Sequence, residues 1–223
     1  MLKLIASNLC KADFEAIITL QEQGIDDYPW LQVDKVSLTE AEQQRLQYLQ
    51  GDLLNCQVQL LNEATVWARA IYPLLLLTEQ RGIQAWSAVT LKAKYPQFEV
   101  ESIDDGAIGR SASGGIEAPF LIVVEAQKGI EAQNPLFQLY AQLLAAARLN
   151  WQKQGQDPQE IFGCYTIADS WTFLRGEVTE LESDKPTLYL EYSREYVEKL
   201  EAVRIFQILR QIVSRFVEPS ALN

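Results

Sequence analysis

The stretch PFLIVVEAQKG, from Pro119 to Gly129, passes from a continuous apolar segment directly into polar residues. Its β-branched and large apolar side chains predict a buried strand. Because side chains alternate along a strand, Glu125 and Gln127 should share one face at its end, and Lys128 should lie on the other. These residues are either the ordinary solvated end of a strand or part of a site.

Short segments rich in β-branched and aromatic residues flank this strand and predict further strands. They cover residues 85–93, 97–103, 161–168, 171–176 and 187–193. The segment YTIADSWTFLR predicts a hairpin that turns at Asp169 and Ser170. The glycine-rich segment DDGAIGRSASGG, residues 104–115, predicts a loop between the second and third strands.

Apolar residues at helical spacing predict helices before, between and after these strands. The expected helices cover Ala12–Gly24, residues 39–50, Asn62–Thr78, residues 134–155 and a long C-terminal segment. Ser193 is expected to cap the C-terminal helix and Pro219 to end it. Asn134 is expected to cap the helix before it, and Gly155 to end that helix.

The order of these elements predicts an α/β fold with a mixed central β-sheet flanked by helices. Residues 1–60 are expected to form a helical N-terminal region, and residues 61–223 an α/β domain, with the two parts making one compact unit. No segment reaches the roughly 18 apolar residues that a membrane span needs, so no membrane partner is expected. The first residues lack a long apolar segment and a cleavage site, which predicts no signal peptide.

Composition restricts the chemistry. The chain has no histidine, which excludes Ser-His-Asp triads, Cys-His pairs and histidine zinc sites. The net charge of −11 would repel duplex DNA, so a nucleic-acid role needs a local basic patch, a bound cation or a partner. The three cysteines are widely spaced, as expected for buried or free thiols in a reducing cytoplasm.

The pattern around Glu125 resembles the PD-(D/E)xK, or restriction-endonuclease-like, nuclease superfamily. The shared features are a helix with an early glutamate, a β-meander, a strand with VVEAQK where similar proteins carry VVEAKK, and a following helix with glutamines. The resemblance covers roughly Asn62 to Arg175. It implies a restriction-endonuclease-like core, a magnesium cofactor and metal-dependent hydrolysis of DNA phosphodiesters.

The resemblance also implies roles for individual residues. Glu125 would be the motif acid, Glu63 the helical acid, and Asp104 or Asp105 the aspartate, together forming the magnesium site. Gln127 or Lys128 would hold the attacking water, and Gln138, one helical turn from Gln142, would face the site from the following helix. Each acid also has an ordinary structural explanation. Glu125 could be a solvated residue at a strand end, and Asp104–Asp105–Gly106 could form a turn. Glu63 could be a favourable negative charge at the start of a helix.

Two departures from the superfamily pattern indicate a partly degraded site. Gln127 stands where the motif has lysine, and an amide can hold a water molecule but cannot take its proton. The GRSASGG segment, where related patterns place the aspartate, contains no acidic residue. A second hypothesis is therefore that the protein retains this fold but is an inactive scaffold, which acts by binding other proteins. Apolar residues on the C-terminal helix predict a homodimer face: Val203, Phe206, Ile208, Leu209, Ile212, Val213 and Phe216.

Overall fold

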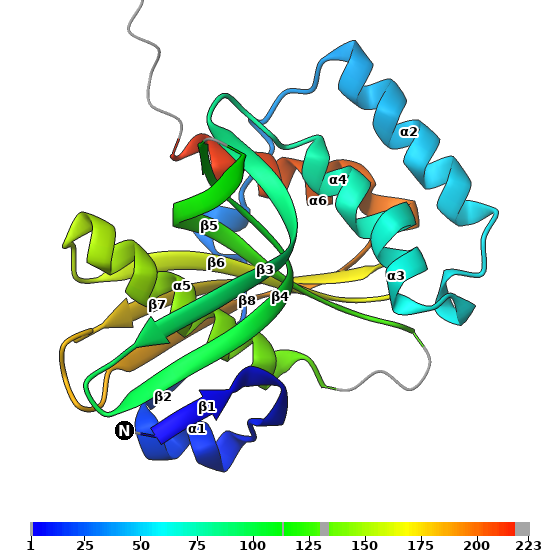
Figure 1. The fold of residues 1–223 in the computed structure, drawn as a ribbon. Coiled ribbons are helices and arrows are strands. Elements are labelled where there is room, and N and C mark those ends of the chain that lie inside the picture. Colours follow the sequence, from blue (N-terminus) through cyan, green and yellow to red (C-terminus); the bar gives the residue numbers. More distant parts are fainter. Residues whose placement is uncertain (1, 113, 130–133, 217–223) are drawn as a thin grey trace, which may run out of the picture.

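The computed structural model describes residues 2–112, 114–129 and 134–216, which are built around a mixed eight-stranded β-sheet (Figure 1). The sheet order is β1-β4-β5-β6-β7-β8-β2, and β3 also pairs with β4. The strands are β1 (Leu2–Ile5), β2 (Thr19–Ile25), β3 (Ile83–Lys94), β4 (Phe98–Ala112), β5 (Gly115–Gln127), β6 (Gln159–Ile167), β7 (Ser170–Thr179) and β8 (Thr187–Val197). The predicted α/β class with a mixed sheet is confirmed.

The strand that carries Glu125 lies inside the sheet. β5 pairs antiparallel with β4 and parallel with β6, and helix α5 (Leu136–Gln154) makes the crossover that parallel neighbours need. Residues 121–124 are buried, with exposed fractions of 1% or less. Both faces of β5 are covered, which explains why this segment reads as a continuous apolar run instead of an alternating one.

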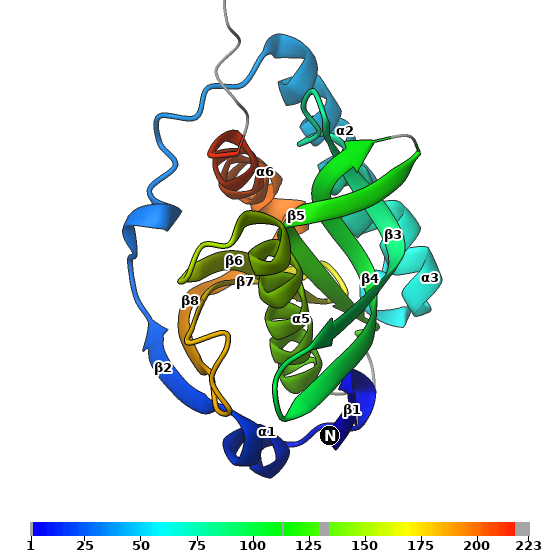
Figure 2. The same cartoon turned by 60° about the vertical axis from the view of Figure 1, so that its left-hand side comes forward.

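Helices cover both faces of the sheet. Helix α5 lies in the hollow of the sheet, between β3–β4 and β8–β2, and packs with α1 (Lys11–Ile17) in one hydrophobic core (Figure 2). The opposite face forms a second core with α6 (Glu198–Ser214) and α2 (Glu40–Leu54). A continuous helical segment completes this second layer: α3 (Glu63–Val66), the π-helical η4 (Trp67–Ile71) and α4 (Tyr72–Leu76).

Several predicted helix ends are confirmed. Asn62 caps α3, because its Oδ1 accepts a hydrogen bond of 2.9 Å from the N–H of Thr65. Gly155 ends α5 in the left-handed conformation, with φ of 71°. Pro73 is the second residue of α4, and the π-helical turn ends two residues before it, at Ile71. Proline lacks the N–H that continues the normal hydrogen-bond ladder, which accounts for irregular helix at this point.

The N-terminal region differs from the predicted one. The helix expected over Ala12–Gly24 ends at Ile17, and strand β2 follows from Thr19. The β-branched residues Ile17, Ile18 and Thr19 favour an extended chain, and pairing with β8 provides the backbone partners. Residues 1–60 thus contain helices together with β1 and β2, which pair with β4 and β8.

Two further predictions are wrong. The segment expected to be a loop is strand from residue 104 to Ala112, because β4 continues to Ala112 and pairs with β3 as far as Arg110. Asp104–Asp105–Gly106 is therefore strand and not turn. Ser193 does not cap the last helix, because β8 continues to Val197; its Oγ instead accepts a hydrogen bond from the N–H of Phe173. Pro219 lies outside the described residues.

Helix α6 packs against its own chain. Phe206, Ile208, Leu209, Ile212 and Val213 have no exposed surface, whereas Val203 is 39% exposed. Most of the residues expected to form a dimer face thus belong to the core of one molecule. In the described part of the chain, no helix is long and apolar enough to cross a membrane.

Candidate functional site

Strands β4 and β5 separate where the predicted site residues lie. Their pairing ends at Gly106 and Val124. Beyond that point the carboxylate of Asp105 bridges the two strands, because its Oδ2 accepts a hydrogen bond of 2.7 Å from the N–H of Ala126. On the other side of β4, Ala88 of β3 adopts a φ of 52°, an unusual conformation for alanine. The sheet is thus locally irregular at Asp105.

Glu125 is held by three side-chain amides. Its Oε2 accepts hydrogen bonds from Nε2 of Gln138 at 2.8 Å and of Gln142 at 2.6 Å. Its Oε1 accepts one from Nε2 of Gln127 at 3.0 Å. The carboxyl is almost fully buried, with 2% of the residue exposed. The expected convergence of Gln138 and Glu125 is therefore present, and Glu125 is not a solvated strand end.

The second aspartate, Asp104, is also buried. Its Oδ1 accepts a hydrogen bond of 2.6 Å from Oγ of Ser102. Its Oδ2 is inaccessible and has no hydrogen-bond partner among the described residues. Ser102 has no place in the superfamily pattern and was not singled out from the sequence. Its position two residues before Asp104 on the same strand is the signal that could have indicated the contact.

Helix α3, on the face of the sheet that α2 and α6 cover, brings Glu63 to the same region. Glu63, Asp104, Asp105 and Ala126 line a cavity of about 280 Å³, together with Trp67, Ser87 and neighbouring residues. Nε1 of Trp67 donates a hydrogen bond of 3.0 Å to Oγ of Ser87, which fixes the indole ring beside β3. Glu125 does not line this cavity, but it is close enough to Asp105 and Glu63 for electrostatic repulsion between the carboxyl groups.

Burial and mutual repulsion make these carboxyl groups weak acids. Burial, with repulsion from Asp105, raises the pKa of Glu125 to about 8, although the amides of Gln142 and Gln127 oppose the rise. Burial also raises the pKa of Asp105 to about 6 and that of Asp104 well above its ordinary range. At pH 7 Asp105 is thus mostly ionised, whereas Glu125 is mostly protonated.

The residues after Glu125 occupy different environments. Gln127 is the last residue of β5, half-buried, and bonded to Glu125. Lys128 lies just beyond the strand and is exposed. Strand β5 therefore ends at Gln127, so Lys128 is not held to the alternating faces of the strand.

The donor set suits a hard divalent cation, but the described residues do not form a ready-made cage. Carboxylate oxygens are the ligands that magnesium prefers, and it often uses one or two of them together with water. The unpartnered Oδ2 of Asp104 fits this chemistry. Across the described ranges, however, no three acidic or cysteine side chains are arranged to hold a metal ion.

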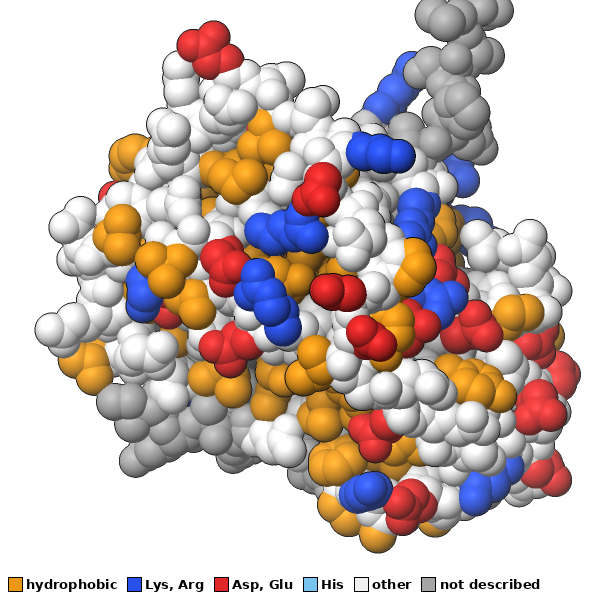
Figure 3. Space-filling model, turned by 180° about the vertical axis from the view of Figure 1, so that it is seen from behind, with side chains coloured by type: hydrophobic (Ala, Val, Ile, Leu, Met, Phe, Trp, Pro, Cys, Tyr) orange, Lys and Arg blue, Asp and Glu red, His pale blue; other side chains and the backbone are white. Residues whose placement is uncertain are grey.

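Lys92 of β3 is neutralised by acidic residues of the neighbouring strand β4. Lys92 forms ion pairs with Glu99 at 3.0 Å and with Glu101 at 3.4 Å. The rear face of the molecule shows acidic and basic side chains interspersed, without a continuous basic region (Figure 3). The cavity beside Asp105 has an acidic lining, so an anionic substrate would be attracted there only with a bound cation.

Comparison with protein-family models finds no family that matches this chain, and comparison with curated proteins finds no match.

Proposed function

We propose that this chain is a restriction-endonuclease-like protein of the PD-(D/E)xK type that binds magnesium and hydrolyses DNA phosphodiesters slowly. The observation that carries the proposal is the separation of β4 from β5 at Asp105. Acids from β4 and α3 line a cavity there, Glu125 of β5 is close enough to be repelled by Asp105 and Glu63, and an oxygen of Asp104 is buried without a hydrogen-bond partner among the described residues.

In this proposal Asp104 and Asp105 hold the cation, and Glu63 and Glu125 complete its surroundings. Magnesium bound there would polarise a phosphate oxygen as a Lewis acid. Gln138 and Gln142 fix the orientation of Glu125 through their hydrogen bonds. Gln127 can position a water molecule but cannot accept its proton, so hydrolysis lacks the contribution of a general base at this position. This deficit accounts for the expected slow rate.

A second candidate function is that of an inactive scaffold that binds other proteins. Two observations favour it: the amide of Gln127 in place of lysine, and the acidic lining of the cavity in a chain of net charge −11. The two candidate functions share the same fold and differ in whether the acidic residues bind a divalent cation.

Calorimetric titration with magnesium and manganese separates the two functions. We expect binding at roughly millimolar affinity or better, which is lost or strongly weakened in Asp105→Asn and in Glu125→Gln. Glu198→Gln is the matched control. Glu198 is also a buried carboxyl with a raised pKa, but its Oε2 accepts a hydrogen bond from Trp171 and it does not line the cavity.

Binding that vanishes in the two site variants and persists in Glu198→Gln would support the cation site. Cleavage of plasmid and single-stranded DNA should then require the metal and stop with EDTA. A folded protein that binds neither metal would reject the hydrolase and leave the scaffold function. Binding without cleavage by the wild type would reject the hydrolase but retain the cation site.

A further inference from the structure

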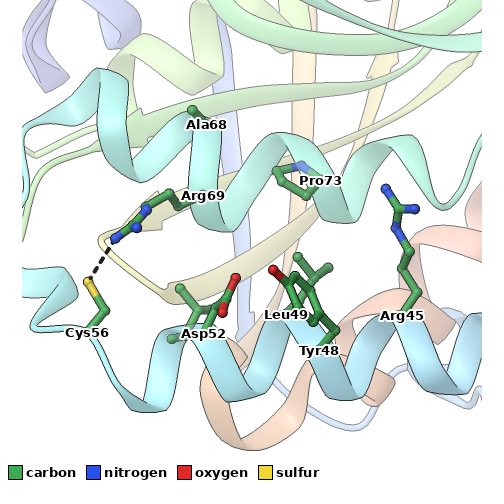
Figure 4. Close-up of a pocket in the computed structure, with 9 residues that line it drawn as sticks. Arg45, Tyr48, Leu49, Asp52, Cys56, Ala68, Arg69 and Pro73 are labelled. Atoms are coloured by element: carbon green, nitrogen blue, oxygen red, sulfur yellow. Dashed lines mark hydrogen bonds between the residues drawn. The ribbon is translucent and has the colours of Figure 1, made fainter.

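A second cavity lies away from the acidic site, between α2 and the helical segment α3–η4–α4 (Figure 4). Its volume is about 490 Å³, which is larger than the cavity beside Asp105 and within the range of small-molecule sites. Its lining residues are Arg45, Tyr48, Leu49, Asp52, Leu53, Cys56, Ala68, Arg69 and Pro73.

The spacing of residues along α2 explains why this helix lines the cavity. Positions 45, 48, 49, 52 and 53 recur at spacings of three and four residues along α2 and so share one side of this helix, and Cys56 follows just beyond its end. Leu49 and Leu53 are buried at its base, whereas Tyr48 is 69% exposed. Pro73 and Ala68 lie opposite them on the facing helix (Figure 4). The middle of the cavity is therefore largely apolar, with Asp52 as its acidic residue.

The two arginines of the cavity are not neutralised by carboxylates. Arg45 and Arg69 form no ion pair with any acidic residue in the described ranges, although the chain has 30 acidic and 19 basic residues. Six other arginines do form such pairs: Arg148, Arg175, Arg194, Arg204, Arg210 and Arg215. Nη1 of Arg69 contacts Sγ of Cys56 at 3.5 Å, a weak interaction for a guanidinium group.

The backbone that carries Arg69 is itself unusual. Ala68 and Arg69 belong to the π-helical segment Trp67–Ile71, a rare geometry that is often found at functional sites. In Figure 4 Arg69 lies at one end of the cavity beside Cys56, and Arg45 lies at the other end. A positive charge thus stands at each end of an apolar middle.

We propose that this cavity binds a small organic anion with an apolar body. A carboxylate or phosphate group would pair with Arg69 or Arg45, because a planar guanidinium group can donate two hydrogen bonds to either. The apolar body would pack against Leu49, Leu53 and Pro73, with the ring of Tyr48 beside it. This proposal does not rest on the hydrolase function proposed above.

Calorimetric titration with phenyl phosphate and with benzoate tests the site, and benzyl alcohol is the uncharged control. We expect the anions to bind and the alcohol not to bind. Arg69→Gln or Arg45→Gln should weaken binding by about tenfold, the loss expected for one charged hydrogen-bonding partner. Both arginines are exposed, so neither variant should impair folding. Arg81→Gln is the matched control, because Arg81 is also exposed but does not line the cavity.

Protection of a cysteine from alkylation shows where on the protein the ligand binds. Cys56 lines the cavity, and Cys10 is exposed elsewhere, so Cys10 serves as an internal reference. With phenyl phosphate present, iodoacetamide should modify Cys56 more slowly while Cys10 reacts at an unchanged rate, as measured by peptide mass spectrometry. Absence of binding at about 10 mM ligand, equal weakening in Arg81→Gln, or binding without protection of Cys56 would each overturn the proposal.

Discussion

At the scale of single residues, Glu125 shows how a buried acid is held by neutral side-chain amides. Three amides donate hydrogen bonds to it, yet burial and nearby acids raise its pKa to about 8. In the unfolded chain this group ionises near pH 4.5. Between these values the folded state binds more protons than the unfolded state, so the free energy of unfolding falls as pH rises.

Glu125→Gln should remove this pH dependence. Without divalent metal, we expect the variant to match the wild type near pH 4 and to exceed its free energy of unfolding at pH 8 by about 4 kcal/mol. Urea unfolding in EDTA at a series of pH values provides the measurement. A stability difference that stays constant from pH 4 to pH 8 would contradict the raised pKa.

Gln127→Lys tests the missing lysine and rests on the proposed hydrolase. An ammonium group beside Glu125 favours the charged carboxylate, so its pKa should fall clearly below 8. Magnesium-dependent DNA cleavage should increase by at least about tenfold, because a cationic donor there can orient the attacking water and stabilise the negative charge that develops on the phosphate. Carboxyl NMR titration and a plasmid assay measure the two effects, and Gln127→Leu is the uncharged control. A lower pKa without faster cleavage would count against the proposed water-positioning role.

At the scale of secondary structure, close contact between Gly106 of β4 and Trp67 of η4 fixes the helical segment on the sheet. A Cβ atom at Gly106 would lie 2.4 Å from Cη2 of Trp67, too close for both to keep their positions. Trp67 also lines the acidic cavity, so displacement of this ring would alter the wall that carries Glu63.

Gly106→Ala should therefore destabilise the protein by about 1–3 kcal/mol, the usual cost of overpacking. Gly51→Ala is the matched control, because Gly51 lies inside α2 with no atom within 4 Å of the added Cβ. That control should gain about 0.5–1 kcal/mol, since alanine favours helix more than glycine does. Urea unfolding measures both changes. Equal effects at the two positions would mean that helix docking does not depend on Gly106.

The sequence predicted those elements whose patterns are local. The spacing of Leu139, Leu143 and Leu144 predicted α5, and the resemblance to the nuclease superfamily implied that Gln138 would face the site of Glu125. The remaining elements depend on strand pairing with segments that are distant along the chain. Strand β2 is mostly exposed and gains its partners from β8, nearly 170 residues later, so its segment has no strand pattern of its own. Asp104 and Asp105 looked like a turn because pairing with β3 is not visible locally.

At the scale of the whole molecule, the N-terminal region belongs to the central fold. Phe14 of α1 is fully buried, and its ring packs against Phe137 and Tyr140 of α5 with centroids 6.0 and 5.8 Å away. β1 and β2 flank the sheet by pairing with β4 and β8. These contacts predict one cooperative unit instead of a separable arm.

Phe14→Ala should lower the free energy of unfolding by about 3–5 kcal/mol and shift a single transition. Leu60→Ala, at a residue that is 63% exposed, should change it by less than about 0.5 kcal/mol. Circular dichroism and tryptophan fluorescence during urea unfolding report on the two sheet faces together. Two separate transitions, of which the variant shifts only one, would show that residues 1–60 unfold independently.

The π-helical turn has a consequence for communication across the molecule. Trp67 forms part of one cavity wall, and the next two residues, Ala68 and Arg69, form part of the other. This short π-helical turn thus separates the two cavities, and a displacement of the turn would change the shape of both. Occupants of the two cavities would then be thermodynamically linked, and each would alter the affinity of the other by the same factor.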